Sequence, residues 1–385
     1  MYIDKIRLHQ YRNYDQLDVE LDPQLNIFVG NNAQGKTNLL ESIYIAGFGN
    51  SFRTSKDKEL VRMGQKQGQV RIEAQKQYGP VTIDFRVNEK GDKEIKVNGG
   101  TLQRRMDLLG TVNVVVFSPE DLRLIKEGPA ERRKFIDREL SHISPKYKGA
   151  LIEYVKILRQ RNELLKQIPY KKEMRSMLPI WDDQLLKAGT DLVILRQKFI
   201  ERLAVISGRI HSGITAEKET FTLTYQPNIN VQFPADYDTI YMAFETRLRA
   251  RTEQDIQRGF TASGPHRDDL GLFVNGVDIR SYGSQGQQRT AALSLRLSEI
   301  EIIHEEIGEY PVLLLDDVMS ELDSNRQNDL IQSIKNVQTI ITITDLDTIE
   351  PNYINRAKVF RIHEGRVIHS DGQEVTRDGS NSERI

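Results

Sequence analysis

The chain has 385 residues, no cysteine and a net charge of −1, with 38% hydrophobic and 28% charged residues. This length allows two or three units with cores of their own, and the lack of cysteine excludes disulfides, thiolate metal sites and cysteine nucleophiles. The chain has no run of about 18 apolar residues, which is the length needed to cross a membrane, and its N-terminal residues lack a signal-peptide core. We therefore expect a cytoplasmic protein without a membrane partner.

The charges are unevenly distributed along the chain. Residues 123–175 contain fifteen Lys or Arg against seven Asp or Glu, a net of +8, whereas residues 297–350 contain two against thirteen, a net of −11. A basic block in an acidic chain favours a polyanionic partner that binds one region. Long solvated helices that carry many charges explain the same pattern equally well.

The N-terminal third has the alternating pattern of β-strands. Strands are predicted at 2–9 and 16–21, on either side of a turn at 12–15, and then at 25–29, 69–78, 81–88, 93–97 and 112–117. Asn98-Gly99 predicts a hairpin turn. Residues 50–68 are polar and basic and are expected to form a loop with a short helix. Ser118-Pro119, followed by acidic residues, predicts the start of a helix.

The pattern between 119 and 212 is helical. Spacings of three and four residues, typical of helices packed at small angles, are shared by the following residues: Leu151, Val155, Leu158, Asn162 and Leu165, and then Trp181, Leu185, Ala188, Leu192, Leu195, Phe199, Leu203, Ile206 and Ile210. We expect an antiparallel helical hairpin with helices about 35 to 50 Å long.

The remainder alternates between strands and helices. Strands are predicted at 220–226, 270–274, 277–280, 311–317 and 338–343, and helices at 236–257, 286–307 and 323–335. Asn275-Gly276 and Glu364-Gly365 predict hairpin turns. The polar tail from Gly372 is expected to be disordered.

The stretch Gly30 to Thr37 reads G-x-x-x-x-G-K-T, a phosphate-binding loop between a predicted strand and a predicted helix. Its backbone N–H groups and the helix N-terminus can bind phosphate oxygens. Lys36 would reach the β- and γ-phosphates and Thr37 would ligate Mg²⁺. A chance match in a surface loop is the alternative, and the strand–loop–helix context favours the nucleotide site. The predicted loop consists of Gly30, Asn31, Asn32, Ala33, Gln34, Gly35, Lys36 and Thr37.

Asp316 ends an apolar strand and has the Walker B pattern, which holds Mg²⁺ through water beside a phosphate loop. Asp317 would orient the attacking water. An acidic turn after a core strand is the common alternative, and the phosphate loop upstream favours the metal site.

Ser284-Gln285-Gly286-Gln287 matches S-x-G-Q, the signature of ATP-binding-cassette ATPases. Ser284 and Gln287 also satisfy the capping-box pattern for the next helix, and both interpretations can hold together. In the cassette design, Ser284, Gly286 and Gln287 face the γ-phosphate of a nucleotide held by a second subunit.

An ordered set of motifs over residues 2–350 resembles the RecF family of bacterial recombination mediators, relatives of SMC-type ATPase heads. The matching stretches are Tyr11-Arg12-Asn13-Tyr14, the phosphate loop with residues 38–43, Phe117 to Leu122, Gly128-Pro129, Arg132-Arg133, Gly264 to Asp269, Ser284 to Arg289, and Leu313 to Asp323, which includes a D-loop-like Ser320-Glu321-Leu322-Asp323. Thr344 replaces the switch histidine of the general cassette pattern. A threonine there is usual in RecF-like proteins and argues against a transporter subunit.

The resemblance implies an α/β fold of the ABC or SMC-head type with a mixed sheet and an inserted helical arm. The expected division is 1–122 and 261–370 for the two halves of the ATPase lobe, 123–260 for the arm, and 371–385 for the tail. It implies a weak ATPase with ATP and Mg²⁺ (at Thr37 and Asp316), catalytic Lys36, Asp316 and Asp317, and base or ribose contacts from Arg12 and Asn13. It further implies an ATP-dependent homodimer, double-stranded DNA at gaps, RecR and, indirectly, RecO and RecA as partners. The DNA-binding candidates are Arg53, Lys56, Arg132, Arg133 and Lys134.

Two alternatives use other features of the chain. A P-loop ATPase that drives nuclease-type chemistry would use Gly264 to Asp269, but the sequence supplies no further carboxylates for a two-metal site. His266 and Arg267 are better explained as structural residues or as neighbours of the nucleotide. A purely structural SMC-like head is disfavoured because the helical insert has tens of residues rather than hundreds.

Overall fold

The computed structural model describes residues 1–369 except 320–326, 328–329, 331–333 and 335. The chain divides into two compact units, Met1–Pro119 with Ile303–Ile385, and Glu120–Ile302. The predicted helix 323–335, the predicted D-loop at 320–323 and the predicted disordered tail lie wholly or largely outside the described residues. No helix in the described part of the chain is long and apolar enough to cross a membrane.

The first unit contains a mixed sheet of six strands in the order β15-β14-β3-β13-β12-β8. All neighbours are parallel except β14 and β15, which form an antiparallel hairpin. The four inner and edge strands β3, β13, β12 and β8 are short apolar runs buried on both faces, as expected when both faces of a sheet are covered, whereas burial alternates along β14. The strands are β3 (Leu25–Val29), β8 (Val114–Phe117), β12 (Val312–Asp316), β13 (Thr339–Ile343), β14 (Lys358–His363) and β15 (Arg366–His369).

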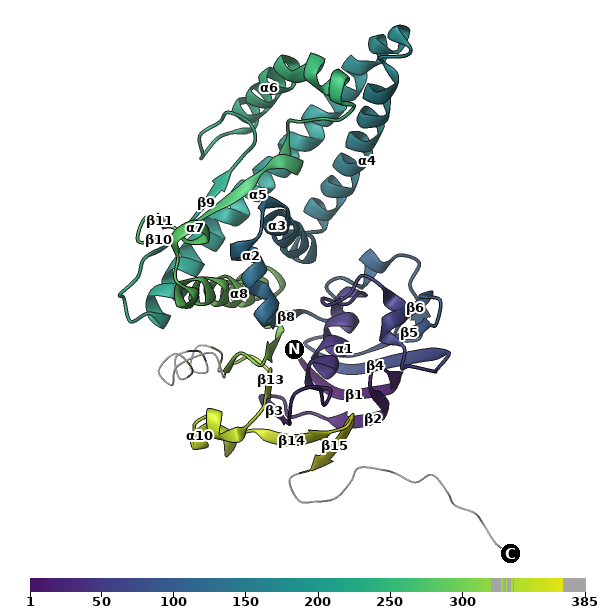
Figure 1. Cartoon of the computed structure of the whole chain (residues 1–385), viewed down its shortest axis with the longest axis vertical. Coiled ribbons are helices and arrows are strands. Elements are labelled where there is room, and N and C mark those ends of the chain that lie inside the picture. The colour runs from purple at the N-terminus through teal and green to yellow at the C-terminus, as the bar shows by residue number, and fades with distance from the viewer. Residues whose placement is uncertain (320–326, 328–329, 331–333, 335, 370–385) are drawn as a thin grey trace, which may run out of the picture. The chain divides into compact units, whose positions relative to one another are not determined.

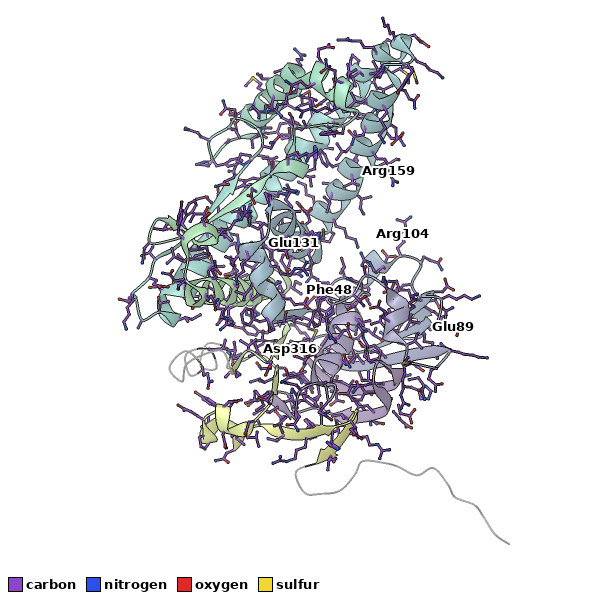
Figure 2. The ribbon with its side chains drawn as sticks, in the orientation of Figure 1. Phe48, Glu89, Arg104, Glu131, Arg159 and Asp316 are labelled. Atoms are coloured by element: carbon purple, nitrogen blue, oxygen red, sulfur yellow. The ribbon has the colours of Figure 1, made fainter. Side chains whose placement is uncertain are left out.

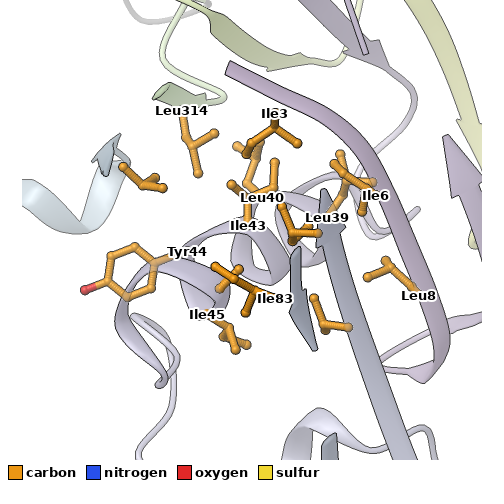
Figure 3. Close-up of a cluster of buried hydrophobic side chains, with 14 of the residues drawn as sticks. Ile3, Ile6, Leu8, Leu39, Leu40, Ile43, Tyr44, Ile45, Ile83 and Leu314 are labelled. Atoms are coloured by element: carbon orange, nitrogen blue, oxygen red, sulfur yellow. The ribbon is translucent and has the colours of Figure 1, made fainter. Parts of the chain in front are cut away.

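A second, antiparallel sheet of the same unit has the order β2-β1-β4-β5-β6-β7. Burial alternates along its strands, so that one face is packed and the other is solvated. Helix α1 (Lys36–Phe48) is buried along most of its length and packs against both sheets. Figure 3 shows Leu39 and Leu40 of this helix in one cluster with Ile3 of the antiparallel sheet and Leu314 of the mixed sheet. The strands are β1 (Tyr2–Tyr11), β2 (Tyr14–Glu20), β4 (Gln67–Lys76), β5 (Gly79–Asn88), β6 (Lys93–Val97) and β7 (Gly100–Thr101), and the short helices of this unit are η1 (Asp57–Leu60), η2 (Arg105–Leu108), η7 (Leu346–Thr348) and α10 (Pro351–Ile354).

The second unit is mainly helical. Helices α4 and α5 lie side by side and α6 packs on α5 (Figure 1), so the predicted helical hairpin is confirmed. With 23 and 37 residues, α4 and α5 are about 35 and 55 Å long. The helices are α2 (Leu122–Lys126), α3 (Pro129–Ile143), α4 (Pro145–Gln167), α5 (Leu178–Ile214), α6 (Tyr237–Arg258), α7 (Ile279–Tyr282) and α8 (Gln285–Ile307), with the short turns η3 (Pro119–Asp121), η4 (Lys172–Met177) and η5 (Pro265–Arg267), and the strands are β9 (Phe221–Gln226), β10 (Asp269–Val274) and β11 (Val277–Asp278).

The predicted packing stripe of α4 is confirmed only at Leu165, which is fully buried, whereas most of the α5 stripe is buried. Val155 is 54% exposed, and α4 instead buries a stripe that includes Tyr154, Ile157 and Arg161. Arg161 is fully buried because its guanidinium pairs with Asp255 and Asp182. A charged residue on the packed face hides that face from a count of apolar residues.

The compact units do not follow the predicted division at 260/261. Residues 261–302 belong to the helical unit, because β10 pairs along its full length with β9 of the arm. The predicted strand 277–280 ends early, since Asp278 caps the short helix α7 by accepting hydrogen bonds from the N–H groups of Arg280 and Ser281. Both Asn-Gly turns are confirmed, with positive φ at Asn98, Gly99, Asn275 and Gly276.

Candidate nucleotide-binding site

A cavity of about 340 Å³ lies within the first unit, where β3 leads into α1 and β12 ends. Asp316, labelled in Figure 2, is the last residue of β12. Polar groups converge there from three segments of the chain. The lining residues are Asn32, Ala33, Gly35, Lys36, Thr37, Asn38, Arg53, Asp316 and Asp317.

The loop from Gly30 to Gly35 needs its glycines. A Cβ on Gly30 would lie 2.4 Å from the carbonyl oxygen of Ile362, and Gly35 has φ +118°, which side chains rarely adopt. Helix α1 begins at Lys36, and Gly35, Lys36 and Thr37 line the cavity, so the free N–H groups of the first helical turn lie beside it. The predicted strand, loop and helix are therefore confirmed.

The Lys36 ammonium folds back over the loop. Its Nζ donates hydrogen bonds to the carbonyl oxygens of Gly30 (2.5 Å) and Asn31 (3.1 Å). Burial lowers the pKa of Lys36, and the nearby carboxylates of Asp317 and Asp316 partly oppose that shift. The loop thus holds a cation whose present partners are neutral carbonyls, which an anion can replace.

Thr37 and Asp316 meet directly. Thr37 Oγ1 donates to Asp316 Oδ1 at 2.9 Å, and Thr342 Oγ1 donates to the same oxygen at 2.8 Å. Burial raises the pKa of Asp316, while these two hydrogen bonds oppose the shift. A hydroxyl and a carboxylate are oxygen ligands of the kind that Mg²⁺ prefers.

Asp317 turns out of the strand that Asp316 ends. It has φ 54°, and its N–H donates to both Oγ1 (3.0 Å) and the carbonyl oxygen (3.2 Å) of Thr342. Its side chain lines the cavity. The two adjacent carboxylates therefore occupy different positions in one site.

Arg12 and Asn13 do not line the cavity among the described residues. The Arg12 guanidinium binds both carboxylate oxygens of the fully buried Glu41, at 2.8 and 2.6 Å, and donates to the carbonyl of Glu59. Asn13 instead donates to the carbonyl oxygen of Gln34 in the phosphate loop. Their predicted contacts with base or ribose stay predictions.

Arg53 and Asn38 are additions to the predicted site. The Arg53 guanidinium donates to Asn38 Oδ1 at 2.7 Å, and both residues line the cavity. Arg53 was predicted from the sequence as a DNA-binding candidate, because a polar basic loop has no pattern that indicates which part of the fold it contacts. Lys56, the next candidate in that loop, is 69% exposed and lies 3.8 Å from Glu59.

The S-x-G-Q stretch lies in the second unit, at the start of α8. Gln287 N donates to Ser284 Oγ (3.2 Å) and Ser284 N donates to Gln287 Oε1 (3.0 Å), which confirms the predicted capping box. Gln287 Nε2 also donates to Glu219 at 3.0 Å. Ser284 is exposed, and a Cβ on Gly286 would meet only the serine oxygen, at 3.9 Å. This helix N-terminus is capped but open on its outer side.

Comparison with known proteins identifies the family. The protein-family model described as RecF/RecN/SMC N terminal domain matches residues 2–365 of the chain. A DNA replication and repair protein RecF from Alkaliphilus oremlandii is 46% identical over 95% of this chain and 100% of its own. The chain belongs to the RecF family.

Solved structures agree with this assignment. A structure described as the recombination mediator protein RecF–ATP in the RecFOR pathway is 37% identical, covers 96% of this chain and 97% of its own, and has a TM-score of 0.88. The Smc head domain of Pyrococcus furiosus, at 18% identity and a TM-score of 0.56, shares the fold. The predicted SMC-head type of ATPase fold, with its helical arm, is confirmed.

The basic candidates of this RecF-family chain differ in accessibility. Arg132 is only 3% exposed, and its guanidinium binds both carboxylate oxygens of Asp269, at 2.6 and 2.9 Å. Arg133 donates to the carbonyl of Asp268 at 2.7 Å. Lys134 is 72% exposed and pairs with Glu131. Of the three, only Lys134 presents its charge mainly to solvent.

The Gly264–Asp269 segment forms internal bonds of the second unit. His266 Nε2 donates to the carbonyl of Thr261 (3.0 Å) and its Nδ1 accepts from the Tyr154 hydroxyl (2.7 Å). Asp268, 1% exposed, pairs with Arg196 at 3.1 Å and accepts from the N–H of Asn228 at 2.7 Å. These contacts support a structural role for His266 and Asp268 rather than metal binding.

Proposed function

We propose that the chain is an ATP-controlled, DNA-binding switch of recombinational and replication-gap repair, which dimerises when ATP is bound. The observation that carries the nucleotide claim is the Thr37–Asp316 contact beside Lys36 in one cavity. A phosphate loop, a Mg²⁺-ligand pair and a lysine in this arrangement are the parts that P-loop ATPases share. The RecF–ATP structure at 37% identity supports the choice of ATP.

The residues present fit ATP and Mg²⁺. Thr37 and Asp316 would hold Mg²⁺, and Lys36 would exchange its two carbonyl partners for β- and γ-phosphate oxygens. Bound Mg²⁺ neutralises charge on the phosphates. Burial raises the pKa of Asp316 in the protein without a bound cation. A bound Mg²⁺ would oppose this shift and favour the ionised form of the carboxylate.

Asp317 would orient the water that attacks the γ-phosphate. The hydrogen bonds from the Asp317 N–H to Thr342 fix the position of the Asp317 backbone. Its side chain is one methylene shorter than that of a glutamate, so its carboxylate reaches less far into the site. Thr344, which follows β13, carries no imidazole to sense the γ-phosphate. Hydrolysis would therefore be slow and would serve to reset the dimer.

The exposed N-terminus of α8 would complete the site of a second copy. Ser284, Gly286 and Gln287 leave an open, capped helix end whose N–H groups and hydroxyl favour an anion. Ser284, Gly286 and Gln287 belong to the second unit, whereas all residues that line the Lys36 cavity belong to the first unit. Two copies related by a twofold axis would each supply one half of two sites.

DNA would bind the closed dimer through its backbone phosphates, with Lys56 and Lys134 as the exposed candidates. Membership of the RecF family supports cytoplasmic work on double-stranded DNA at single-strand gaps, with RecR as the direct partner and RecO and RecA as indirect ones. In this scheme the dimer marks a gap and helps RecA to load.

Sizing of the purified protein with ATP and Mg²⁺, with and without duplex DNA, tests this proposal. We expect a dimer with ATP and Mg²⁺, a monomer without nucleotide, and a monomer for Ser284→Arg under both conditions. Tyr78→Arg, at an exposed hairpin tip, is a control for a surface arginine. Unchanged dimerisation of Ser284→Arg would overturn the composite site.

A further inference from the structure

We propose that Asn13 and Tyr14 are positioning residues that fix the direction of two consecutive N–H groups in the phosphate loop. This inference rests on the proposed nucleotide-binding function and gives Asn13 a role different from direct contact with the base or ribose. Both residues belong to the β1–β2 hairpin, and neither lines the cavity among the residues that the structure describes.

Asn13 acts on the peptide between Gln34 and Gly35. The Gln34 carbonyl oxygen accepts from Asn13 Nδ2 at 2.8 Å and from the N–H of Gly365 at 3.1 Å. In a trans peptide the N–H points opposite to the C=O. Two donors on the outer side of the loop therefore direct the Gly35 N–H toward the inner side, where a phosphate oxygen would bind.

Tyr14 acts on the next peptide. Its hydroxyl donates to the Gly35 carbonyl oxygen at 3.0 Å, and that oxygen also accepts from the N–H of Leu39 at 3.0 Å in the first turn of α1. Burial raises the pKa of Tyr14, so it remains a hydrogen-bond donor. The Lys36 N–H is fixed in the opposite direction, and two neighbouring N–H groups become available to one anion.

The hairpin fits the loop too closely to be an incidental neighbour. A Cβ on Gly35 would lie 2.7 Å from Asn13 Nδ2 and 3.0 Å from the Tyr14 hydroxyl. The orientation of the Asn13 amide is fixed at its other end, because Asn38 Nδ2 donates to Asn13 Oδ1 at 2.8 Å. An amide with both ends engaged has one orientation, and only that orientation places its donor on Gln34.

The β14–β15 turn holds the same loop residue from a second direction. Glu364 N donates to Gln34 Oε1 at 2.5 Å, beside the bond from Gly365 N to the Gln34 carbonyl. A Cβ on Gly365 would lie 2.6 Å from the Asn13 carbonyl oxygen, at a φ of +73°. Gly365→Ala would therefore displace Asn13 and the turn together, without altering any side chain of the phosphate loop.

The test measures affinity for ATP, ADP and inorganic triphosphate, each with Mg²⁺, by calorimetry. For Asn13→Ala we expect an about tenfold loss for all three ligands, since the part-buried hydrogen bonds to Gln34 and from Asn38 are both removed, with a smaller loss for Tyr14→Phe. Gly365→Ala should match Asn13→Ala. The controls are Asn88→Ala, which loosens another turn of the same unit, and Gly99→Ala, at φ +82° with nothing within 4 Å of an added Cβ.

Inorganic triphosphate separates the two roles because it has no base or ribose. If Asn13→Ala weakens ATP but leaves inorganic triphosphate unchanged, Asn13 contacts the nucleoside and the inference is overturned. Equal losses in the two control variants would also overturn it, since they would show general destabilisation. Failure of the unaltered protein to bind ATP would instead reject the proposed function itself.

Discussion

Thr37 Oγ1 donates to Asp316 Oδ1 at 2.9 Å, although 279 residues separate the two in the sequence. The contact joins the first turn of α1 to the end of β12, and Thr342 of β13 binds the same oxygen. One carboxylate oxygen at the end of β12 therefore accepts hydrogen bonds from two other elements, α1 and β13. The carboxylate is costly to ionise while buried, which is the property expected of a group that awaits a cation.

We predict that Asp316→Asn stabilises the nucleotide-free protein and abolishes Mg²⁺-dependent binding. The raised pKa means that the ionised carboxylate costs folding free energy at pH 7, a cost that is absent below the ordinary pKa near 3.8. Asparagine keeps an acceptor for both threonines without that charge. Thermal unfolding should show a melting temperature a few degrees higher and no further rise with Mg²⁺ and ATP. A lower melting temperature of the nucleotide-free variant would contradict this explanation.

Asp317→Asn should separate binding from hydrolysis. The backbone bonds to Thr342 remain, so the cavity keeps its shape, while the side chain loses the charge that would orient water. We expect ATP affinity within about twofold of the unaltered protein and a hydrolysis rate lower by about 100-fold, measured as phosphate release. The ATP-bound dimer should persist longer. Normal hydrolysis would assign the water-orienting role elsewhere.

Removal of the Arg132 and Lys134 side chains should change the stability of the protein by very different amounts. Arg132→Ala leaves Asp269 without its bidentate partner, and because Asp269 is 23% exposed the cost should be below the about 3 to 5 kcal/mol of a fully buried pair but above about 1 kcal/mol. Lys134→Ala should change the free energy of unfolding by less than about 0.5 kcal/mol. Urea unfolding followed through Trp181, the single tryptophan of the chain, measures both. Equal stability of the two variants would contradict the structural role of Arg132.

The affinity for duplex DNA should depend on Lys134 and Lys56, and it should not depend on Lys187, which lies outside the proposed contacts. If Lys134 and Lys56 contact phosphates, each Lys→Ala variant should reduce the slope of log affinity against log salt by about 1. Lys187→Ala on α5, where Lys187 pairs with Asp183, is the matched control. Unchanged slopes in both variants would place the DNA contacts on other residues.

His266 should make the second unit sensitive to acid. Burial lowers its pKa to about 4, from an ordinary 6.5. Since the unfolded chain takes up a proton below pH 6.5 and the folded chain does not, stability falls as the pH drops from about 6.5 to 4. The loss from this one group should be no more than about 3 kcal/mol. Trp181-detected unfolding at pH 7.5 and 5 measures it.

His266→Gln, which keeps a donor and an acceptor, should remove that part of the pH dependence. Its stability at pH 7.5 will itself be lower because the Tyr154 and Thr261 contacts are imperfectly replaced. An identical pH profile in this variant would show that other groups cause the acid sensitivity.

Much of this site could be predicted because its signals are local. The phosphate loop is eight contiguous residues, and Ser284 and Gln287 form their capping box within one helical turn. Parallel strands such as β12 appear as apolar runs that end in acids. Local spacing and turn chemistry determine each of these features.

The rest depends on partners that are distant in the sequence. Arg132 meets Asp269 across 137 residues, and Gln34 meets Glu364 across 330. Nothing near Arg53 indicates that its loop returns to the nucleotide cavity. Most of the packed face of α4, apart from Leu165, was misassigned because a buried Arg161 interrupts it, and only the positions of Asp182 and Asp255 explain that burial.

The central claim is that each complete site takes Lys36 from one copy and Ser284 from another. Mixing Lys36→Ala and Ser284→Arg chains that carry different tags tests it most directly, because each heterodimer then contains one intact site. We predict that neither variant dimerises alone, and that the mixture forms heterodimers only with ATP and Mg²⁺. A mixture that stays monomeric, or dimers of either variant alone, would contradict the account.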